Sequence, residues 1–363
     1  MTRDELQSRA TDILEEKKRL ICMWCTGCGK SKVVLNYVDR HIQDTVLILV
    51  PEQNNIQNWR DEFAKFDVMD WNVTVICYAS FHKYVDSYWD LVVFDEAPHV
   101  DTDLRKSICR SVKGEHILAL GAVISDEERE TLENIYGKFV LSHVSLSRAI
   151  QLGYLPMPEI FVLHIQLDNV KHTHMYKGQR LTAREKYDIL QSEVKKATNA
   201  FNIQASYPNK MKMLKSGSVR KRFLGEMKED AIRRICENLV NKNRRFLCFC
   251  SSIKQAELLG KDHAFTSKTP VSMKLLEKFN AGDINSLYVV GKLIEGQNLN
   301  NIECGVLGQL GGTDRITVQS LGRILRAEKP KVFVPIFDGT KDEGFLRTLT
   351  DNVPNEYIKH FKF

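Results

Sequence analysis

The chain has 363 residues, of which 43% are apolar and 27% charged, and its formal net charge is +6. This length allows two domains with sizeable cores, and the composition is that of a globular protein. The nine cysteines follow no disulfide-scaffold spacing, no apolar run is long enough to span a membrane, and residues 1–5 are too polar for a secretory signal. We therefore expect a cytoplasmic protein that is not bound to a membrane.

The first expected element is a helix over residues 3–18, in which apolar residues recur at helical spacing. Arg3 and Gln7 lie about one helical turn apart on it. Spacing alone predicts that both are exposed polar side chains.

A phosphate-binding loop is the strongest local signal. Residues 20–23 form an apolar run typical of a buried strand, residues 24–31 read Trp-Cys-Thr-Gly-Cys-Gly-Lys-Ser, and a helical pattern follows. Glycines let the backbone turn its N–H groups toward an anion. Lys30 would reach the β- and γ-phosphates, and the Ser31 hydroxyl would bind Mg²⁺. The other loop residues expected to hold the nucleotide are Thr26, Gly27, Cys28 and Gly29.

Two features of this loop leave alternatives open. The usual pattern has a small residue at the position of Trp24, so the alternative is a glycine turn followed by a chance Lys-Ser pair. Cys22, Cys25 and Cys28 have the C-x-x-C-x-x-C spacing of some zinc and iron–sulfur sites. A metal would compete with phosphate for the same loop, so we favour small buried cysteines and interpret Trp24 as a packing variation.

Two adjacent carboxylates follow an apolar strand. Strands are expected at residues 45–51 and 73–77, with a helix between them, and a third strand over residues 88–94 leads into Asp95 and Glu96. At the same sheet edge as the phosphate loop, Asp95 would bind Mg²⁺ and Glu96 would act as general base on the attacking water. The alternative is a solvated acidic turn, which the preceding apolar strand disfavours.

The alternation of strands and helices predicts the fold class. A strand at residues 115–120 and a helix at residues 125–138 continue the pattern of a doubly wound parallel sheet. Glycine and prolines near residues 148–158 indicate a connection to a second unit. We place the first domain at residues 1–150 and the second at residues 151–363.

A basic insert lies inside the second domain. Residues 171–245 carry 19 Lys and Arg against 7 Asp and Glu, a balance of +12, whereas the rest of the chain sums to −6. Two helices are expected there, at about residues 182–198 and 223–241, joined by a flexible segment rich in Lys, Gly and Ser. Such a local charge excess indicates contact with a polynucleotide, and the alternative is a solvated helical insert. The residues whose neutralisation should weaken this contact are Arg220, Lys221 and Arg222.

A second series of strands and helices follows, with strands at residues 245–250, 286–290 and 304–307. A helix at residues 317–326 carries Gln319, Arg323 and Arg326. Two guanidinium groups three residues apart share a helix face and can clamp a triphosphate. Taken alone, the two arginines are better explained as surface residues.

In this order, the phosphate loop, the Asp95-Glu96 strand end and the Gln-x-x-Gly-Arg-x-x-Arg helix resemble the motifs of superfamily 2 helicases over nearly the whole chain. The likeness is greatest to compact phage and bacterial DEAD/DEAH-type helicases related to restriction-enzyme translocases. It implies an α/β fold with two RecA-like doubly wound parallel-sheet domains, the second carrying the basic, largely helical insert. It also implies ATP and Mg²⁺ as cofactors, with ATP hydrolysed between the two domains.

The resemblance assigns roles to residues whose spacing alone was uninformative. Arg3 and Gln7 match the upstream motif that recognises adenine. The segment at residues 51–59 resembles the first nucleic-acid-contacting motif.

In the second domain, Gly296 and Asn298 match a loop that contacts both nucleic acid and nucleotide. Gln319, Arg323 and Arg326 match motif VI, in which the two arginines would be the arginine fingers.

Two departures from the family pattern concern the coupling of hydrolysis to strand separation. Pro98 stands where the family usually has His or Asp, and residues 118–123 lack the hydroxyls of the usual Ser/Thr-Ala-Thr motif. We expect an ATP-dependent helicase or translocase. Two alternatives remain open, a nucleic-acid-binding protein with a vestigial nucleotide site and a remodelling ATPase that does not unwind strands.

The expected partner is nucleic acid, with DNA favoured over RNA. We expect a monomer that acts with replication or recombination proteins, located in the host cytoplasm if the protein is encoded by a phage.

Overall fold

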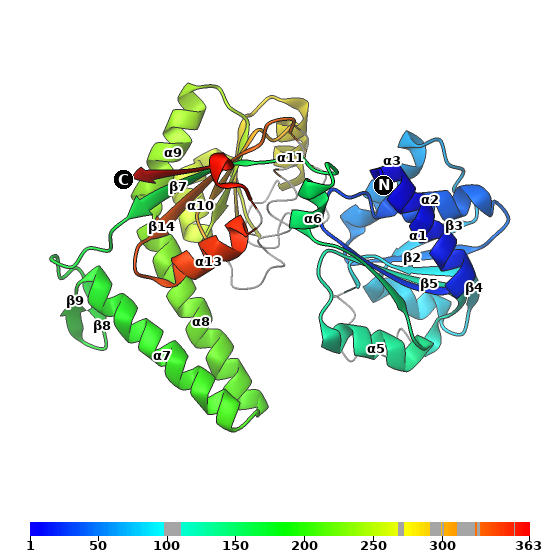
Figure 1. Cartoon of the computed structure of the whole chain (residues 1–363), viewed down its shortest axis with the longest axis horizontal. Coiled ribbons are helices and arrows are strands. Elements are labelled where there is room, and N and C mark those ends of the chain that lie inside the picture. The colour runs from blue at the N-terminus through cyan, green and yellow to red at the C-terminus, as the bar shows by residue number, and fades with distance from the viewer. Residues whose placement is uncertain are drawn as a thin grey trace. The chain divides into compact units, whose positions relative to one another are not determined.

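The computed structural model of the protein describes residues 1–97, 110–267, 272–290, 299, 301–310, 324, 327–351 and 353–363. The chain folds into two compact units, of which the first contains Met1–Pro156 and the second begins at Met157. Each unit is built on a parallel sheet (Figure 1). None of the helices described is long and apolar enough to cross a membrane.

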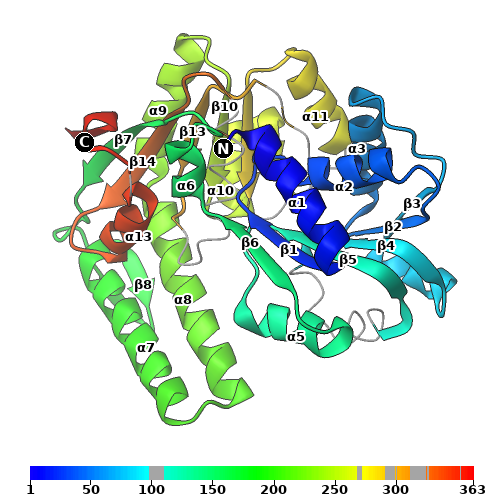
Figure 2. The ribbon, with the colours of Figure 1, turned by 45° about the vertical axis from the view of Figure 1, so that its right-hand side comes forward.

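The sheet of the first unit has the strand order β3-β2-β4-β5-β1-β6, and its paired strands run parallel. The strands are β1 (Arg19–Trp24), β2 (Val46–Val50), β3 (Val73–Cys77), β4 (Tyr88–Phe94), β5 (Lys113–Gly121) and β6 (Val140–Val144). The helices are α1 (Arg3–Lys17), α2 (Ser31–Arg40), α3 (Gln53–Lys65), the 3-10 helix η1 (Tyr78–Tyr84), α5 (Asp126–Tyr136) and α6 (Leu146–Gln151). Figure 2 shows α1 lying across β1 and beside α2, both of which it contacts.

Local sequence explains these elements. β2 reads Val-Leu-Ile-Leu-Val and is buried at all five positions, as expected for a strand covered on both faces of a parallel sheet. α5 begins with a capping box in which Ser125 accepts from the Glu128 N–H and the Glu128 side chain accepts from the Ser125 N–H. The predicted alternation of strands and helices is therefore confirmed in this unit.

The second unit contains a seven-stranded parallel sheet with the order β11-β12-β10-β13-β14-β7-β15. Its strands are β7 (Glu159–Ile165), β10 (Phe246–Cys250), β11 (Ala264–Phe265), β12 (Ser286–Val290), β13 (Cys304–Leu307), β14 (Lys331–Phe337) and β15 (Ile358–Lys362). The helices that accompany it are α9 (Glu229–Asn241), α10 (Ile253–Gly260), η3 (Lys261–His263), α11 (Ser272–Ala281), α13 (Lys341–Thr350) and η5 (Asn355–Tyr357). Two doubly wound parallel sheets are thus present, as predicted.

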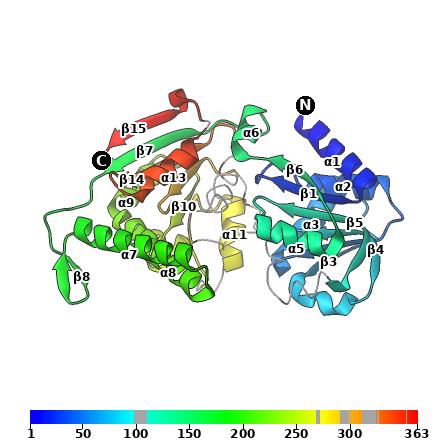
Figure 3. The ribbon, with the colours of Figure 1, turned by 60° about the horizontal axis from the view of Figure 1, so that its bottom comes forward.

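The basic insert is a helical hairpin. A short antiparallel pair, β8 (His174–Tyr176) and β9 (Gln179–Leu181), precedes α7 (Ala183–Ile203) and α8 (Tyr207–Met227). The two helices lie side by side in Figures 1, 2 and 3.

The predicted flexible segment between two helices is wrong, because α8 runs through it. Pro208 in the first turn of α8 suits a helix start, and the Lys, Met, Leu and Arg residues that follow are good helix formers. Gly217 lowers the intrinsic stability of the helix. The packing of Phe223 and Leu224 against Tyr187 and other apolar residues offsets this loss.

A buried ion pair fixes the base of this hairpin to the second unit. Lys228, between α8 and α9, places its Nζ 2.8 Å from the Asp342 carboxylate of α13, and the two side chains are 1% and 4% exposed. Asp342 also accepts from the Phe337 N–H. Tyr187 of α7 accepts from the Lys341 N–H at 2.8 Å, which joins the same two parts again.

Replacing Lys228 by Met should destabilise the second unit by about 3–5 kcal/mol, because the Asp342 carboxylate would remain buried without its charge partner. The matched control is Lys359→Met, which breaks the exposed ion pair with Glu159 and should cost about 1 kcal/mol or less. Urea unfolding followed by far-UV circular dichroism measures both. Equal losses of unfolding free energy in the two variants would contradict the conclusion that the buried pair stabilises the unit more than an exposed pair does.

Candidate nucleotide site

The loop between β1 and α2 has the shape of an anion cradle. Gly27 and Gly29 adopt φ angles of +95° and +76°, in the left-handed region that favours glycine. Lys30 precedes α2 with helical angles, and no side chain caps the first turn of that helix. The Lys32 and Val33 N–H groups donate to the Gly29 and Lys30 carbonyls, so it is the helix dipole that favours an anion in front of the loop. The predicted sequence of strand, glycine turn and helix is confirmed.

Gln7 supports this loop from α1. Its side chain is 4% exposed, and its Nε2 donates to the Cys28 carbonyl at 3.0 Å. A Cβ added to Gly29 would lie 2.3 Å from the same Nε2 atom, so the position tolerates only glycine without movement of Gln7. The prediction from spacing that Gln7 is exposed is wrong, because α1 packs this face against α2 and the loop. Arg3 is exposed, as spacing predicted.

Lys30 and Ser31, the two side chains predicted to bind phosphate and Mg²⁺, each form a hydrogen bond with a polar neighbour. Lys30 Nζ donates to the Trp24 carbonyl at 3.0 Å, which folds the ammonium group over the loop. Ser31 Oγ donates to Glu62 Oε2 of α3 at 3.2 Å. Neither the Lys30–Trp24 nor the Ser31–Glu62 contact was foreseen from the sequence.

Trp24 and the loop cysteines serve packing. Trp24 is fully buried and donates its indole N–H to Ser142 Oγ of β6 at 2.9 Å, which confirms its interpretation as a packing variation. The sulfur atoms of Cys25 and Cys28 lie 3.2 Å apart. The hydrogen bond between them raises the pKa of Cys25 and lowers that of Cys28. Within the described ranges, no group of three His, Cys, Asp or Glu side chains is placed to hold a metal ion.

Asp95 stands at the carboxyl end of β4 and is held on both carboxylate oxygens. Oδ2 accepts from the Trp59 indole N–H of α3, and Oδ1 accepts from the Glu96 N–H, each at 3.0 Å. Desolvation, and then the negative charge of Glu96, raises the pKa of Asp95 to about 6. The Trp59 hydrogen bond and the positive charge of Lys30 oppose this rise in pKa, so Lys30 and Asp95 act on each other across one sheet edge.

Glu96 has a strained backbone and a side-chain oxygen, Oε2, that accepts no hydrogen bond within the described residues. Its φ angle is +50°, which is uncommon for a residue other than glycine. Its Oε2 atom is buried and has no hydrogen-bond partner in the part of the chain that the structure describes. A buried carboxylate oxygen without a donor is well suited to accept a proton from a water molecule.

The residues at this edge fit a nucleotide with its cation. The loop offers backbone donors and Lys30 to phosphate, while Ser31 Oγ and the Asp95 carboxylate are the oxygen donors that Mg²⁺ prefers. The unpaired Glu96 Oε2 and the absence of room for a Cβ at Gly29 are the structural observations that support this fit.

The remaining predicted site residues lie outside the described part of the chain. They are Gly296, Asn298, Gln319, Arg323 and Arg326. Pro98 also lies outside it, whereas Leu118, Ala119 and Leu120, at the position of the altered motif, are buried residues of β5.

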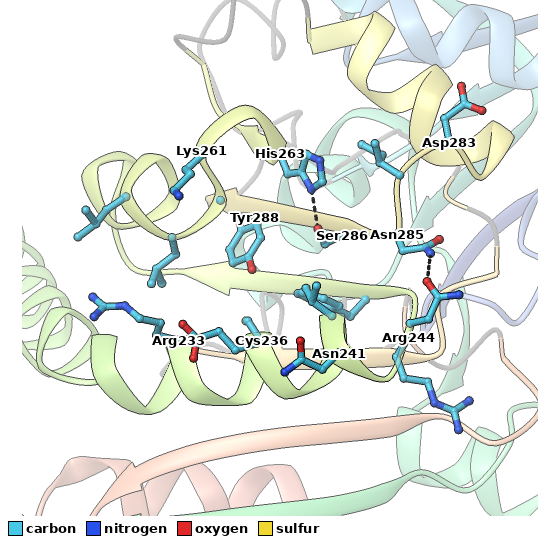
Figure 4. A pocket seen from close by; sticks show the side chains of 18 residues that line it. Arg233, Cys236, Asn241, Arg244, Lys261, His263, Asp283, Asn285, Ser286 and Tyr288 are labelled. Atoms are coloured by element: carbon cyan, nitrogen blue, oxygen red, sulfur yellow. Dashed lines mark hydrogen bonds between the residues drawn. The ribbon is translucent and has the colours of Figure 1, made fainter.

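The second unit contains a separate pocket of about 930 Å³ between α9 and α10 (Figure 4). Phe246 and Ser286, the first residues of β10 and β12, line it. His263 Nδ1 lies 2.7 Å from Ser286 Oγ in this pocket. Ligands of open α/β sheets bind at the carboxyl ends of the strands, so this pocket lies at the wrong edge for a nucleotide.

No family model matches the chain. Among curated proteins, it is 24% identical to a DNA 3′-5′ translocase XPB2 of Sulfurisphaera tokodaii, over 94% of this chain and 83% of that protein. It is 21% and 24% identical to putative DNA 3′-5′ helicases Rad25 of Halobacterium salinarum and Haloarcula marismortui, over 93% and 92% of its length. The chain spans about half the length of these two proteins, 54% and 52%.

Solved structures share the fold at low sequence identity. The Pyrococcus furiosus Hef helicase domain matches with a TM-score of 0.56 and 14% identity, over 96% of this chain and 99% of that one. Saccharomyces cerevisiae Dbp5 bound to RNA and ADP BeF3 matches with a TM-score of 0.60 and 12% identity, over 98% and 89%. The predicted two-domain RecA-like architecture is therefore confirmed.

Because Asp95 has a pKa of about 6, we expect Mg²⁺-dependent nucleotide binding to weaken below that pH. The carboxyl group keeps its proton there and a bound cation requires the ionised form. Titration of a fluorescent ATP analogue between pH 5 and 8, with and without Mg²⁺, measures the effect. Asp95→Asn is the control and should lack this part of the pH dependence, and an identical pH profile in both proteins would contradict the assignment.

Proposed function

We propose that this chain, a superfamily 2 helicase, hydrolyses ATP to move along DNA in the 3′-5′ direction and to separate its strands. The observation that carries the proposal is the meeting of Lys30, Ser31, Asp95 and Glu96 at one sheet edge, on the fold of helicase domains. The choice of DNA and of direction is supported by the names of the three curated relatives. RNA remains the second candidate substrate, since one structural neighbour is bound to RNA.

Each residue of the site has a distinct task. Lys30 exchanges the Trp24 carbonyl for a phosphate oxygen, so its ammonium group neutralises charge on the nucleotide. Ser31 and Asp95 would hold Mg²⁺, which neutralises phosphate charge when bound. Glu96 accepts the proton of the attacking water on its free Oε2 atom. Arg3 and Gln7, at the end of the site formed by α1, are assigned to the adenine base.

Five residues outside the described part of the chain are also assigned to the proposed site. Gln319, Arg323 and Arg326 are assigned to the triphosphate, and Gly296 and Asn298 to the nucleic acid and nucleotide. These assignments are supported by the motif resemblance alone.

ATP hydrolysis with and without DNA tests the motor. Lys30→Ala should lower kcat by about 10²–10³-fold through loss of charge stabilisation, and Glu96→Gln by about 10²–10⁴-fold with nucleotide binding retained. A phosphate-release assay with single- and double-stranded DNA and RNA measures both effects. Undiminished turnover in Lys30→Ala would contradict the nucleotide site, and a lack of stimulation by every polynucleotide would contradict the motor. Unwinding of duplexes with a 3′ or a 5′ tail then tests the direction.

A remodelling ATPase that does not unwind strands is the second candidate. The apolar residues Leu118, Ala119 and Leu120 of β5 favour it, since they offer no hydroxyl at the position that couples hydrolysis to strand separation in relatives. Displacement of a triplex strand without unwinding of a tailed duplex would distinguish this activity from that of a helicase.

The helical hairpin is the proposed contact for the nucleic-acid backbone. No Asp or Glu occurs in residues 194–225, and Lys210, Lys212, Lys215 and Arg222 of α8 are exposed. Arg220 does not belong to this surface, because it is 8% exposed and its guanidinium group bonds to Gln191 of α7. Neutralising Arg220 would therefore disturb the packing of the hairpin, so the sequence-based choice of this residue needs correction.

Replacing Lys210, Lys212 and Lys215 together by Ala should weaken DNA binding and reduce the slope of log K against log salt concentration by about 2–3, with basal ATPase retained. The matched control replaces Lys17, Lys113 and Lys138, three exposed lysines near the amino ends of the strands of the first sheet. Fluorescence anisotropy with labelled DNA at several salt concentrations measures the slope. An unchanged slope in the α8 variant would show that these lysines face solvent and do not contact DNA.

A further inference from the structure

Both expected Mg²⁺ ligands are held by the same helix. Trp59 of α3 donates to Asp95 Oδ2 at 3.0 Å, and Glu62 of α3 accepts from Ser31 Oγ at 3.2 Å. Residues three apart lie on one helix face, so α3 presents both groups toward the phosphate loop.

We propose that Trp59 and Glu62 are positioning residues of the magnesium site, which orient Asp95 and Ser31 for the cation. The inference rests on the proposed function, because it assigns a role within the same nucleotide site. It adds α3 to the phosphate loop and the β4 strand end as an element that forms this site.

The Trp59 indole suits an Asp95 carboxylate that carries no proton and only accepts hydrogen bonds. An indole N–H can only donate, so the contact favours the ionised form of Asp95 and disfavours a proton on Oδ2. Trp59 is 4% exposed, and its indole therefore has little freedom to turn away. Together with the Glu96 N–H on Oδ1, it fixes the plane of the carboxylate before any cation arrives.

Glu62 acts on the other expected Mg²⁺ ligand, Ser31, as a hydrogen-bond acceptor. A hydroxyl that binds a cation through its oxygen lone pair must direct its proton elsewhere. Glu62 Oε2 accepts a hydrogen bond from the Ser31 hydroxyl, which leaves the lone pairs of Oγ for the metal. Glu62 is only 28% exposed, and Lys65 Nζ lies 3.7 Å from its other oxygen.

Packing makes α3 a rigid support for both contacts. Phe63, one residue after Glu62, is 2% exposed. At the end of the helix, the ammonium group of Lys32 in α2 lies 4.2 Å from the centre of the Phe66 ring. The helix is thus attached to the core and to α2, and a site held by such regular elements keeps its geometry.

The test compares nucleotide affinity with Mg²⁺ and with EDTA, using a fluorescent ATP analogue and the full-length chain. Trp59→Phe keeps an aromatic side chain, although a smaller one, and removes the N–H, and Glu62→Leu keeps the approximate size and removes the acceptor. Each should lower the gain in affinity that Mg²⁺ provides by tenfold or more, with the affinity in EDTA unchanged within about twofold. Asp61→Asn, at an exposed carboxylate of the same helix, is the control and should change neither value.

An unchanged gain from Mg²⁺ in folded Glu62→Leu would overturn the proposal, as would an equal loss of affinity in Mg²⁺ and in EDTA. Circular dichroism establishes that each variant is folded, and Glu62→Leu decides the matter if Trp59→Phe does not fold. If the proposed function is wrong, the result is different: the wild-type protein would bind nucleotide with Mg²⁺ but would not hydrolyse ATP. The binding ratios of the variants would still report on Trp59 and Glu62 in that case.

Discussion

The environment of the Asp95 carboxylate is the constraint on which the first unit depends. A parallel sheet places this group among desolvating strand ends, next to a second carboxylate, so its charged form is costly. The Trp59 N–H, the Glu96 N–H and the positive charge of Lys30 offset part of that cost. In the proposed Mg²⁺ site, a bound cation would compensate the charge that the fold leaves only partly balanced.

Two helices from different parts of the chain support the phosphate loop from its outer side. α1 contributes Gln7, which donates to the Cys28 carbonyl, and α3 contributes Glu62, which accepts from Ser31. Both contacts are hydrogen bonds made by polar side chains, and they add to the packing of the buried Trp24, Cys25 and Cys28 side chains of the loop. Hydrogen bonds and packing together hold the loop, and Gly29 leaves the space that the Gln7 amide occupies.

In the second unit, a buried charge pair performs the corresponding structural task. Lys228 and Asp342 join the base of the α7–α8 hairpin to α13 through a charge pair that is almost fully buried. The hairpin is consequently a fixed part of the unit at its base, while its far end carries exposed lysines on α8. This arrangement separates the charges that stabilise the fold, such as Arg220, from those that remain available to a polyanion.

The sequence by itself determined the two parallel sheets, the phosphate loop and the Asp95-Glu96 strand end, because each depends on local signals such as apolar runs and glycine spacing. It did not reveal β7, β14 and β15, in which Phe161 pairs with Phe333 and Lys359 across long stretches of chain. Only the tertiary structure decided that Gln7 is buried against the loop, that Arg220 is unavailable, and that Trp59 and Glu62 reach Asp95 and Ser31. The reason is physical, since burial and hydrogen-bond partners follow from which elements pack together, and single-residue spacing carries no record of that packing.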